Sequence, residues 1–149
     1  MGELARLQQD GKVEHVGLSN VNVAQIRIAQ GILPVVSVQN KCHVFMQRSL
    51  RDDVVGYCAR SQIAFLAHSP VGGHGRQKRL GESKLLLELA RRTDATPWQV
   101  ALAWLLHQGN HIIPIPGASR PESITSSLQA CGVHLSREDL AALDGLQDW

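Results

Sequence analysis

The sequence is poor in the residues that mark several protein classes. It has 3 cysteines, Cys42, Cys58 and Cys131, and no CxxC pair, so we expect neither a disulfide framework nor a structural zinc site. No apolar run approaches the roughly 20 residues of a membrane-spanning helix, and the first residues lack the apolar core of a secretory signal. We therefore expect a cytoplasmic protein with reduced thiols and no membrane partner.

Neither sign of charge dominates, and several ligand motifs are missing. The chain has 15 basic and 13 acidic residues, a net charge of +2, which gives no reason to expect a nucleic-acid partner. No HExxH or other two-histidine spacing occurs, so we predict no metal. The glycine-rich stretch SPVGGHG, residues 69–75, does not have the order GxGxxG, which excludes a Rossmann dinucleotide fingerprint.

What the sequence does contain is an alternation of short apolar segments and helical segments. The apolar segments are rich in Val or Ile and are typical of buried parallel strands. They span 13–19, 35–40, 63–69 and 111–117. Strand and helix alternate about four times without a Ser/Gly-rich linker, which indicates βαβ units around a parallel sheet. We predict one α/β domain over residues 1–149.

Helix starts are marked by side chains that can cap a first turn. The expected caps are Asn22 with Gln25, Ser49, Thr96 with Gln99, Ser119 with Glu122, and Ser136 with Asp139. The first of these helices follows the strand of VGLSNVNVAQIRIAQG, residues 16–31, through the polar pair Ser19-Asn20. In an enzyme, polar groups at such a junction face a ligand.

Five motifs, in order, resemble the second half of aldo-keto reductases. They are GKVEHVGLSNV, PVVSVQN, FLAHSPVGG, TPWQVALAWLL and IPIPGASRPESI. The resemblance implies strands five to eight of a TIM (β/α)8 barrel that binds NADP(H) and reduces carbonyls. It covers nearly the whole chain. It therefore implies half of a barrel, with about four parallel strands and flanking helices.

The resemblance also implies roles for individual residues. Ser19, Asn20 and Gln39 match positions that hold the nicotinamide carboxamide, and His68 stands where an aromatic ring stacks on the nicotinamide. His68 is also our candidate catalytic residue, since imidazole titrates near neutral pH. Two loops match positions along the pyrophosphate and near the adenosine 2′-phosphate. These residues are Ser69, Pro70, Val71 and Gly73 in the first loop and Pro116, Gly117, Ala118, Ser119 and Arg120 in the second.

Two departures from the family pattern limit what the resemblance implies. Ser126 and Ser127 replace the usual Glu-Asn pair that contacts adenine, which weakens the expectation of NADP(H). The catalytic Asp, Tyr, Lys and His of the family come from strands two to four, which have no counterpart here. The only tyrosine, Tyr57, lies in a predicted helix. Reduction of a carbonyl requires a proton donor, so classical reductase activity of the isolated chain is doubtful.

Half a barrel also leaves one face of its sheet bare, and we expect Val16, Val36, Val38, Phe65 and Ile113 on that face. An exposed apolar sheet with unpaired edges is prone to associate, so we predict a homodimer or higher oligomer that binds a small molecule. Two alternatives stay open beside an NADP(H)-linked oxidoreductase. One is a lyase, cyclase or isomerase that uses His68 in an oligomeric pocket, and the other is a non-catalytic assembly protein.

Overall fold

Four parallel strands form the centre of the protein, as the sequence predicts. The computed structural model describes residues 1–73 and 77–146, without the side chain of Gln77. The strands are hydrogen-bonded in their sequence order, β1-β2-β3-β4. They are β1 (Gly17–Ser19), β2 (Ser37–Lys41), β3 (Ala64–His68) and β4 (Ile112–Ile115). The α/β architecture with flanking helices is confirmed, although the strands are shorter than the apolar segments that predicted them.

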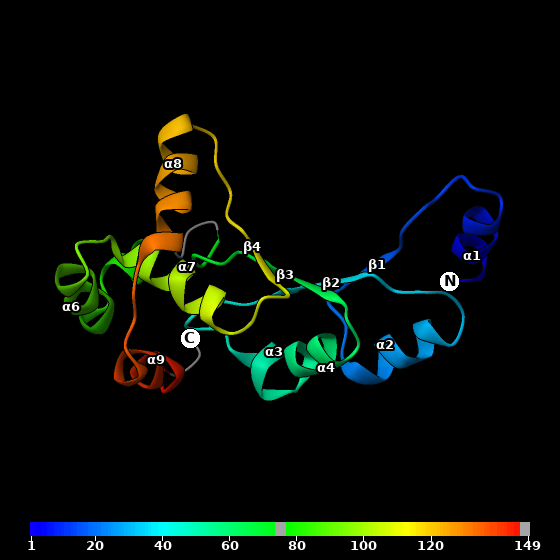
Figure 1. The fold of residues 1–149 in the computed structure, drawn as a ribbon, viewed down its shortest axis with the longest axis horizontal. Coiled ribbons are helices and arrows are strands. Elements are labelled where there is room, and N and C mark those ends of the chain that lie inside the picture. Colours follow the sequence, from blue (N-terminus) through cyan, green and yellow to red (C-terminus); the bar gives the residue numbers. More distant parts are fainter. Residues whose placement is uncertain (74–76, 147–149) are drawn as a thin grey trace.

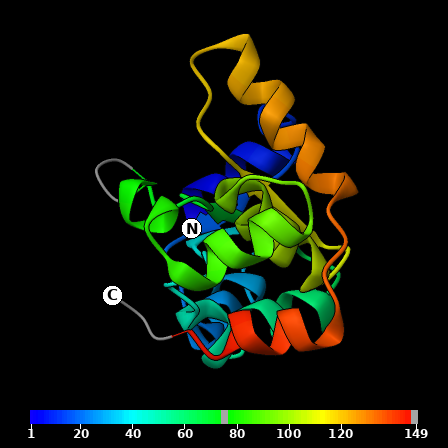
Figure 2. The ribbon, with the colours of Figure 1, turned by 90° about the vertical axis from the view of Figure 1, so that its left-hand side faces the viewer.

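Helices cover one side of this sheet far more completely than the other. Helices α2 and α4 lie below the strands in Figure 1, whereas α8 and α1 rise above them at opposite ends of the sheet. The turned view also separates α8, at the top, from α9, at the bottom (Figure 2). The helices are α1 (Gly2–Gln9), α2 (Val23–Gln30), α3 (Arg48–Arg51), α4 (Val54–Arg60), α5 (Gln77–Gly81), α6 (Lys84–Arg92), α7 (Pro97–His107), α8 (Pro121–Gln129), the 3-10 turn η1 (Ala130–Gly132) and α9 (Arg137–Asp144).

Three of the predicted helix caps are present. Asn22, Thr96 and Ser136 each accept a hydrogen bond from the backbone three residues on, and the side chain at that position bonds back to the cap. Each pair satisfies two backbone donors that a helix start otherwise leaves without a partner. These caps fix where α2, α7 and α9 leave their loops.

Two predicted caps are wrong. Ser49 lies inside α3, and the expected single helix breaks at Asp53, whose φ of 58° is left-handed. Helix α8 begins after Arg120 with no side-chain cap, so Ser119 does not start it. Its first residue is Pro121, which lacks an N–H and needs no partner there.

The two faces of the sheet differ in burial. Val38 and Phe65 are fully buried, and they alternate with half-buried residues along β2 and β3. The expectation that Val16, Val38 and Phe65 lie on a bare face is therefore wrong, because they form the core with the helices. Ile113, on the opposite face, is 50% exposed, as expected for a bare face, whereas Val36 precedes β2 and is 37% exposed. We call the less covered side, which carries Ser19, Gln39 and His68, the inner face.

Helix α7 anchors the helix layer behind the sheet. Trp104 is fully buried, and its Nε1 donates to Asp144 Oδ1 of α9 at 2.7 Å. Arg92 of α6 donates to Asp139 of α9. Trp98 lies six positions before Trp104 and is 38% exposed, as expected for two residues that face different directions.

The free edge of β4 has few backbone donors. Phe65 N–H donates to His111 O at 2.8 Å, so residues 111, 113 and 115 direct their backbone groups to β3. Ile112 and Pro114 therefore direct theirs to the free edge. Ile112 N–H donates to Gly109 O at 3.1 Å, and Pro114 has no N–H.

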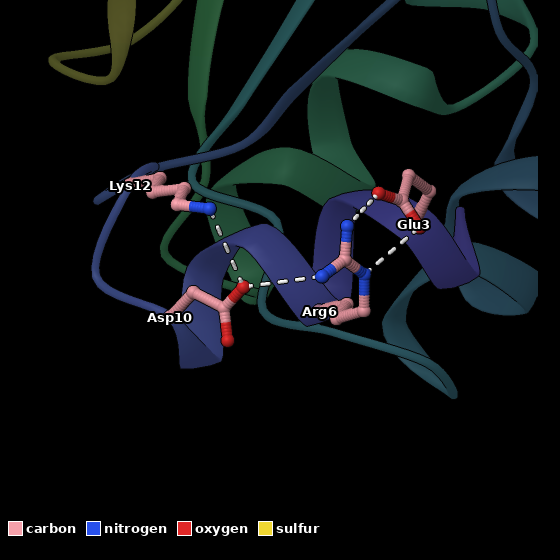
Figure 3. A network of polar contacts seen from close by, with 4 residues as sticks. All are labelled: Glu3, Arg6, Asp10 and Lys12. Carbon is pink, nitrogen blue, oxygen red and sulfur yellow. Dashed lines mark hydrogen bonds and ion pairs between the residues drawn. The ribbon is translucent and has the colours of Figure 1, made fainter.

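Helix α1 stands apart at the other end of the sheet. Arg6 bonds to Glu3 and, at 3.3 Å, to Asp10, and Lys12 Nζ lies 3.8 Å from the same Asp10 carboxylate (Figure 3). All four side chains are exposed, so these pairs contribute little stability. No helix in the described ranges is long and apolar enough to cross a membrane.

Candidate functional site

Ser19, the last residue of β1, lies beside Gln39, the middle residue of β2. The parallel register pairs Ser19 of β1 with Gln39 of β2, and Gln39 with Leu66 of β3. Since side chains alternate between faces along a strand, all three are on the inner face. The register thus brings together two of the residues that the sequence assigned to an amide-binding role.

Asn40 fixes the loop that carries Asn20. Its side chain accepts from Val21 N–H at 3.0 Å and donates to Val21 O at 2.8 Å. Asn20 has a left-handed φ of 55°, its N–H donates to Gln39 O, and its Nδ2 donates to Ser19 Oγ at 3.1 Å. We did not predict a role for Asn40; its strand-end position next to Gln39 was the available signal.

His68 ends β3 on the inner face, beside Lys41 of β2 in the register. Its Nδ1 lies 3.2 Å from Ser69 Oγ. Burial lowers the pKa of His68, and the positive charge of Lys41 lowers that pKa further. The ring is therefore mostly neutral at pH 7. Lys41 is a second residue that sequence reasoning missed, although the two-residue period from Gln39 places it on the same face.

The loop after β3 is tightly folded around Ser69. Ser69 has a φ of 53°, and Gly72 N–H donates to Ser69 O at 2.9 Å. Gly73 has a φ of +70°, and a Cβ there would lie 2.9 Å from Ser69 Oγ. Left-handed residues in a tight turn are the backbone conformation from which anion-binding nests are built.

A cavity of about 400 Å³ lies next to this loop. It is lined by Val71, by Pro116 and Gly117 after β4, and by Ser126 and Ser127 of α8. Trp98 of α7 also lines it. One cavity therefore contains Val71 of the first predicted phosphate loop and Pro116 and Gly117 of the second. The same cavity contains Ser126 and Ser127, which replace the Glu-Asn pair.

The remaining residues of the second loop are not part of this cavity. Ala118, Ser119 and Arg120 are exposed, and none of the three lines it. Ser126 is also engaged, since its O and Oγ accept from Gln99 Nε2 at 3.0 and 3.2 Å. Pro70 and Val71 of the first loop are both buried.

Tyr57 and His43 form hydrogen bonds within the protein. Tyr57 is half-buried on α4, where its OH donates to Gln30 Oε1 at 2.7 Å. His43 is fully buried, and its Nδ1 accepts from Phe45 N–H at 3.2 Å. Among the residues that the structure describes, no three of His, Cys, Asp or Glu gather in a way that suits a metal ion.

Comparisons with known proteins agree on one family. The model of the aldo/keto reductase family matches residues 1–148. Pyridoxine 4-dehydrogenase of Escherichia coli K12 is 38% identical over 143 residues, which are 96% of this chain and 48% of that protein. An uncharacterized oxidoreductase of Schizosaccharomyces pombe is 33% identical over 95% of this chain and 45% of its own length.

Solved structures show the same half-length match. Aldose reductase from Giardia lamblia superposes with a TM-score of 0.86 at 25% identity, over 98% of this chain and 50% of that one. An aldo-keto reductase from Klebsiella pneumoniae in complex with NADPH shares the fold, with a TM-score of 0.82, 24% identity and coverage of 93% of this chain and 50% of that one. The chain thus has the fold of half a TIM barrel and spans about half the length of these relatives.

Proposed function

This chain belongs to the aldo/keto reductase family, and we propose that it binds NADP(H) and forms the cofactor side of a carbonyl oxidoreductase. The observation that carries the proposal is the register of Ser19, which ends β1, with Gln39 of β2, on the same face as His68. A hydroxyl and an amide side by side on adjacent strands offer a donor and an acceptor to a planar carboxamide. The nicotinamide carboxamide is such a group.

His68 supports the same proposal through its shape and its charge. Its ring ends β3 one position before the nest-like loop at Ser69, so a nicotinamide over the ring has its phosphates directed toward that loop. Because the pKa of His68 is lowered, a neutral imidazole faces the ring, and the cationic oxidised nicotinamide is not repelled.

The 400 Å³ cavity is the proposed place for the adenosine. Trp98 offers an aromatic surface at its rim, and the hydroxyl of Ser127 and the carboxylate of Glu122 offer polar contacts. Ser119 and Arg120 lie at the start of α8, next to this cavity, where the positive end of the helix dipole favours an anion. This is where we place the 2′-phosphate.

The test is a titration of the intact chain with NADPH, followed by tryptophan fluorescence. We expect NADPH to quench the tryptophan fluorescence saturably. In Trp98→Phe this quenching should be lost, while calorimetry should still detect NADPH binding. Ser19→Ala and Gln39→Ala each remove a neutral hydrogen bond and should weaken binding about 2- to 10-fold.

The matched controls are Ser61→Ala at the opposite end of the sheet and Gln9→Ala on α1, which should change nothing. Absence of NADPH binding by a folded chain at millimolar cofactor would contradict the proposal.

Hydride transfer to a carbonyl also needs a proton donor at the developing alkoxide. The single tyrosine, Tyr57, is held by Gln30 in the helix layer and does not reach the strand ends. We therefore propose that another polypeptide chain covers the inner face. We propose a second copy of this chain as that polypeptide.

Exposed apolar side chains support self-association. Ile113 and Ile115 on the inner face are 50% and 37% exposed, and Ile124 and Leu128 of α8 are 53% and 67% exposed. Beside these two lies an apolar groove of about 250 Å³ that Leu102, Leu106 and Pro114 also line. A monomer that leaves this surface in water is prone to associate.

The contact of His68 with Ser69 favours a second candidate, a lyase, cyclase or isomerase with His68 as its acid–base group. In that case His68→Ala abolishes turnover of a small metabolite. Addition of NADPH to the wild-type chain leaves that turnover unchanged. In the oxidoreductase, His68→Ala instead weakens NADPH binding.

A further inference from the structure

A second polar cavity, of about 290 Å³, lies at the carboxyl ends of β1 and β2. It is lined by the loop after β1, by the end of β2 and by α3, and it contains none of the inner-face residues assigned above to the cofactor except Asn20. Its size is at the lower end of the range for small-molecule sites.

Lys41 is the main charge of this cavity. It is half-buried, it lines the cavity, and the register places it beside His68. Within residues 1–73 and 77–146, no carboxylate forms an ion pair with the Lys41 ammonium. An ammonium without a carboxylate partner, at the wall of a cavity, is a position that favours an anionic ligand.

Ser49 adds a hydroxyl that is otherwise unused. It is only 5% exposed and lines the same cavity. In the described part of the chain, the Ser49 hydroxyl forms no hydrogen bond. Because Ser49 lines the cavity and its hydroxyl is not used within the described protein, that hydroxyl is available to a bound group.

Arg48 and Asp52 complete the rim. Arg48 Nε donates to Asp52 Oδ2 at 2.9 Å, which leaves the terminal guanidinium nitrogens free to point elsewhere. Two cations and one carboxylate leave one positive charge in excess. The start of α2, at Asn22, borders the cavity and adds the positive end of a helix dipole.

We propose that this cavity binds the oxyanion group, carboxylate or phosphate, of a small metabolite, with Lys41 as its counter-ion and Ser49 and Arg48 as donors. Lys41 belongs both to the cavity and to the inner-face row that contains His68. A ligand held here by its oxyanion extends its other end toward His68. The direction of the ligand toward His68 rests on the proposed function, whereas binding of the oxyanion does not.

The experiment titrates the intact chain with inorganic phosphate and, separately, with acetate, and follows backbone amide shifts by NMR. We expect saturable shifts at Lys41, Ser49 and Asn22. Lys41→Gln should weaken binding at least about tenfold and Ser49→Ala about 2- to 10-fold, while Lys41→Arg keeps affinity within about threefold. The matched control is Lys84→Gln, an exposed lysine on α6. Tighter binding of phosphate or of acetate identifies which oxyanion the cavity prefers.

Shifts confined to residues 116–121, or equal affinity in the folded Lys41→Gln variant, would overturn the proposal. The outcome is separable from that of the NADPH titration. Phosphate binding at Lys41 without NADPH binding contradicts only the proposed function, and the reverse result contradicts only the oxyanion site.

Discussion

The side chain of Asn40 forms two hydrogen bonds with the backbone of Val21, one at 3.0 Å to its N–H and one at 2.8 Å to its carbonyl. Asn40 is 9% exposed, so water does not readily replace these bonds. The pair joins the end of β2 to the loop after β1. It therefore positions Ser19 and Asn20.

Replacing Asn40 with Ala should lower both stability and cofactor affinity. The change leaves the N–H and carbonyl of Val21 unsatisfied, at a cost of about 1–3 kcal/mol in the free energy of unfolding. Urea denaturation measures this cost, with the exposed Asn110→Ala as the control. A variant as stable as the wild type, with unchanged NADPH binding, would show that the loop is held by other contacts.

The pKa of His68 makes stability depend on pH. Because burial and then Lys41 lower this pKa in the folded state, the unfolded chain binds the proton more tightly. Below an unfolded value of about 6.5, stability should therefore fall with pH until the folded pKa is passed. His68→Asn should reduce that loss, and Lys41→Gln should raise the pKa of His68 measured by NMR titration. An unchanged pKa in Lys41→Gln would contradict the prediction.

Charges on α8 should prevent self-association. Ile124 and Leu128 are one helical turn apart, so both lie on one face of α8. The double change Ile124→Asp and Leu128→Asp places two carboxylates in the proposed contact and should shift sedimentation from dimer to monomer. Ile28→Asp, at a 68% exposed position on α2, serves as the control. A wild-type chain that sediments as a folded monomer at micromolar concentration would rule out the dimer.

The two tryptophans of α7 should differ in their effect on stability. Trp104→Phe leaves a void in the core and removes the bond to Asp144, so we expect a loss of about 2–4 kcal/mol in the free energy of unfolding. Trp98→Phe, at the exposed rim, should cost less than about 1 kcal/mol. Thermal or urea unfolding of both variants checks the contrast, and equal losses would contradict it.

Local signals in the sequence predicted most of the fold. The caps at Asn22, Thr96 and Ser136 depend on side chains within three residues, so their pattern is readable without tertiary information. The break at Asp53 was missed because helical propensity does not reveal that one residue adopts a left-handed φ. Ser119 was mistaken for a cap because Pro121 starts α8 unaided.

The candidate site was predicted less completely. The family motifs predicted Ser19, Gln39 and His68 as site residues, and the register brings their strands together. The assignment of Val38 and Phe65 to the bare face was wrong, because an apolar run has no polar alternation that fixes which face is which. Lys41 and Asn40 follow Gln39 directly, yet their roles depend on a neighbouring strand and loop that no local pattern specifies.

Pro114 governs how the free edge of β4 can meet another chain. With no N–H at Pro114 and that of Ile112 already engaged, this border can accept hydrogen bonds but hardly donate them. A strand from another chain could donate hydrogen bonds to this edge but would receive few from it. Such incomplete pairing does not support repeated strand addition between chains. A partner chain at the β4 edge must therefore be recognised through the shape of its side chains. This favours one specific partner and disfavours the growth of fibrils.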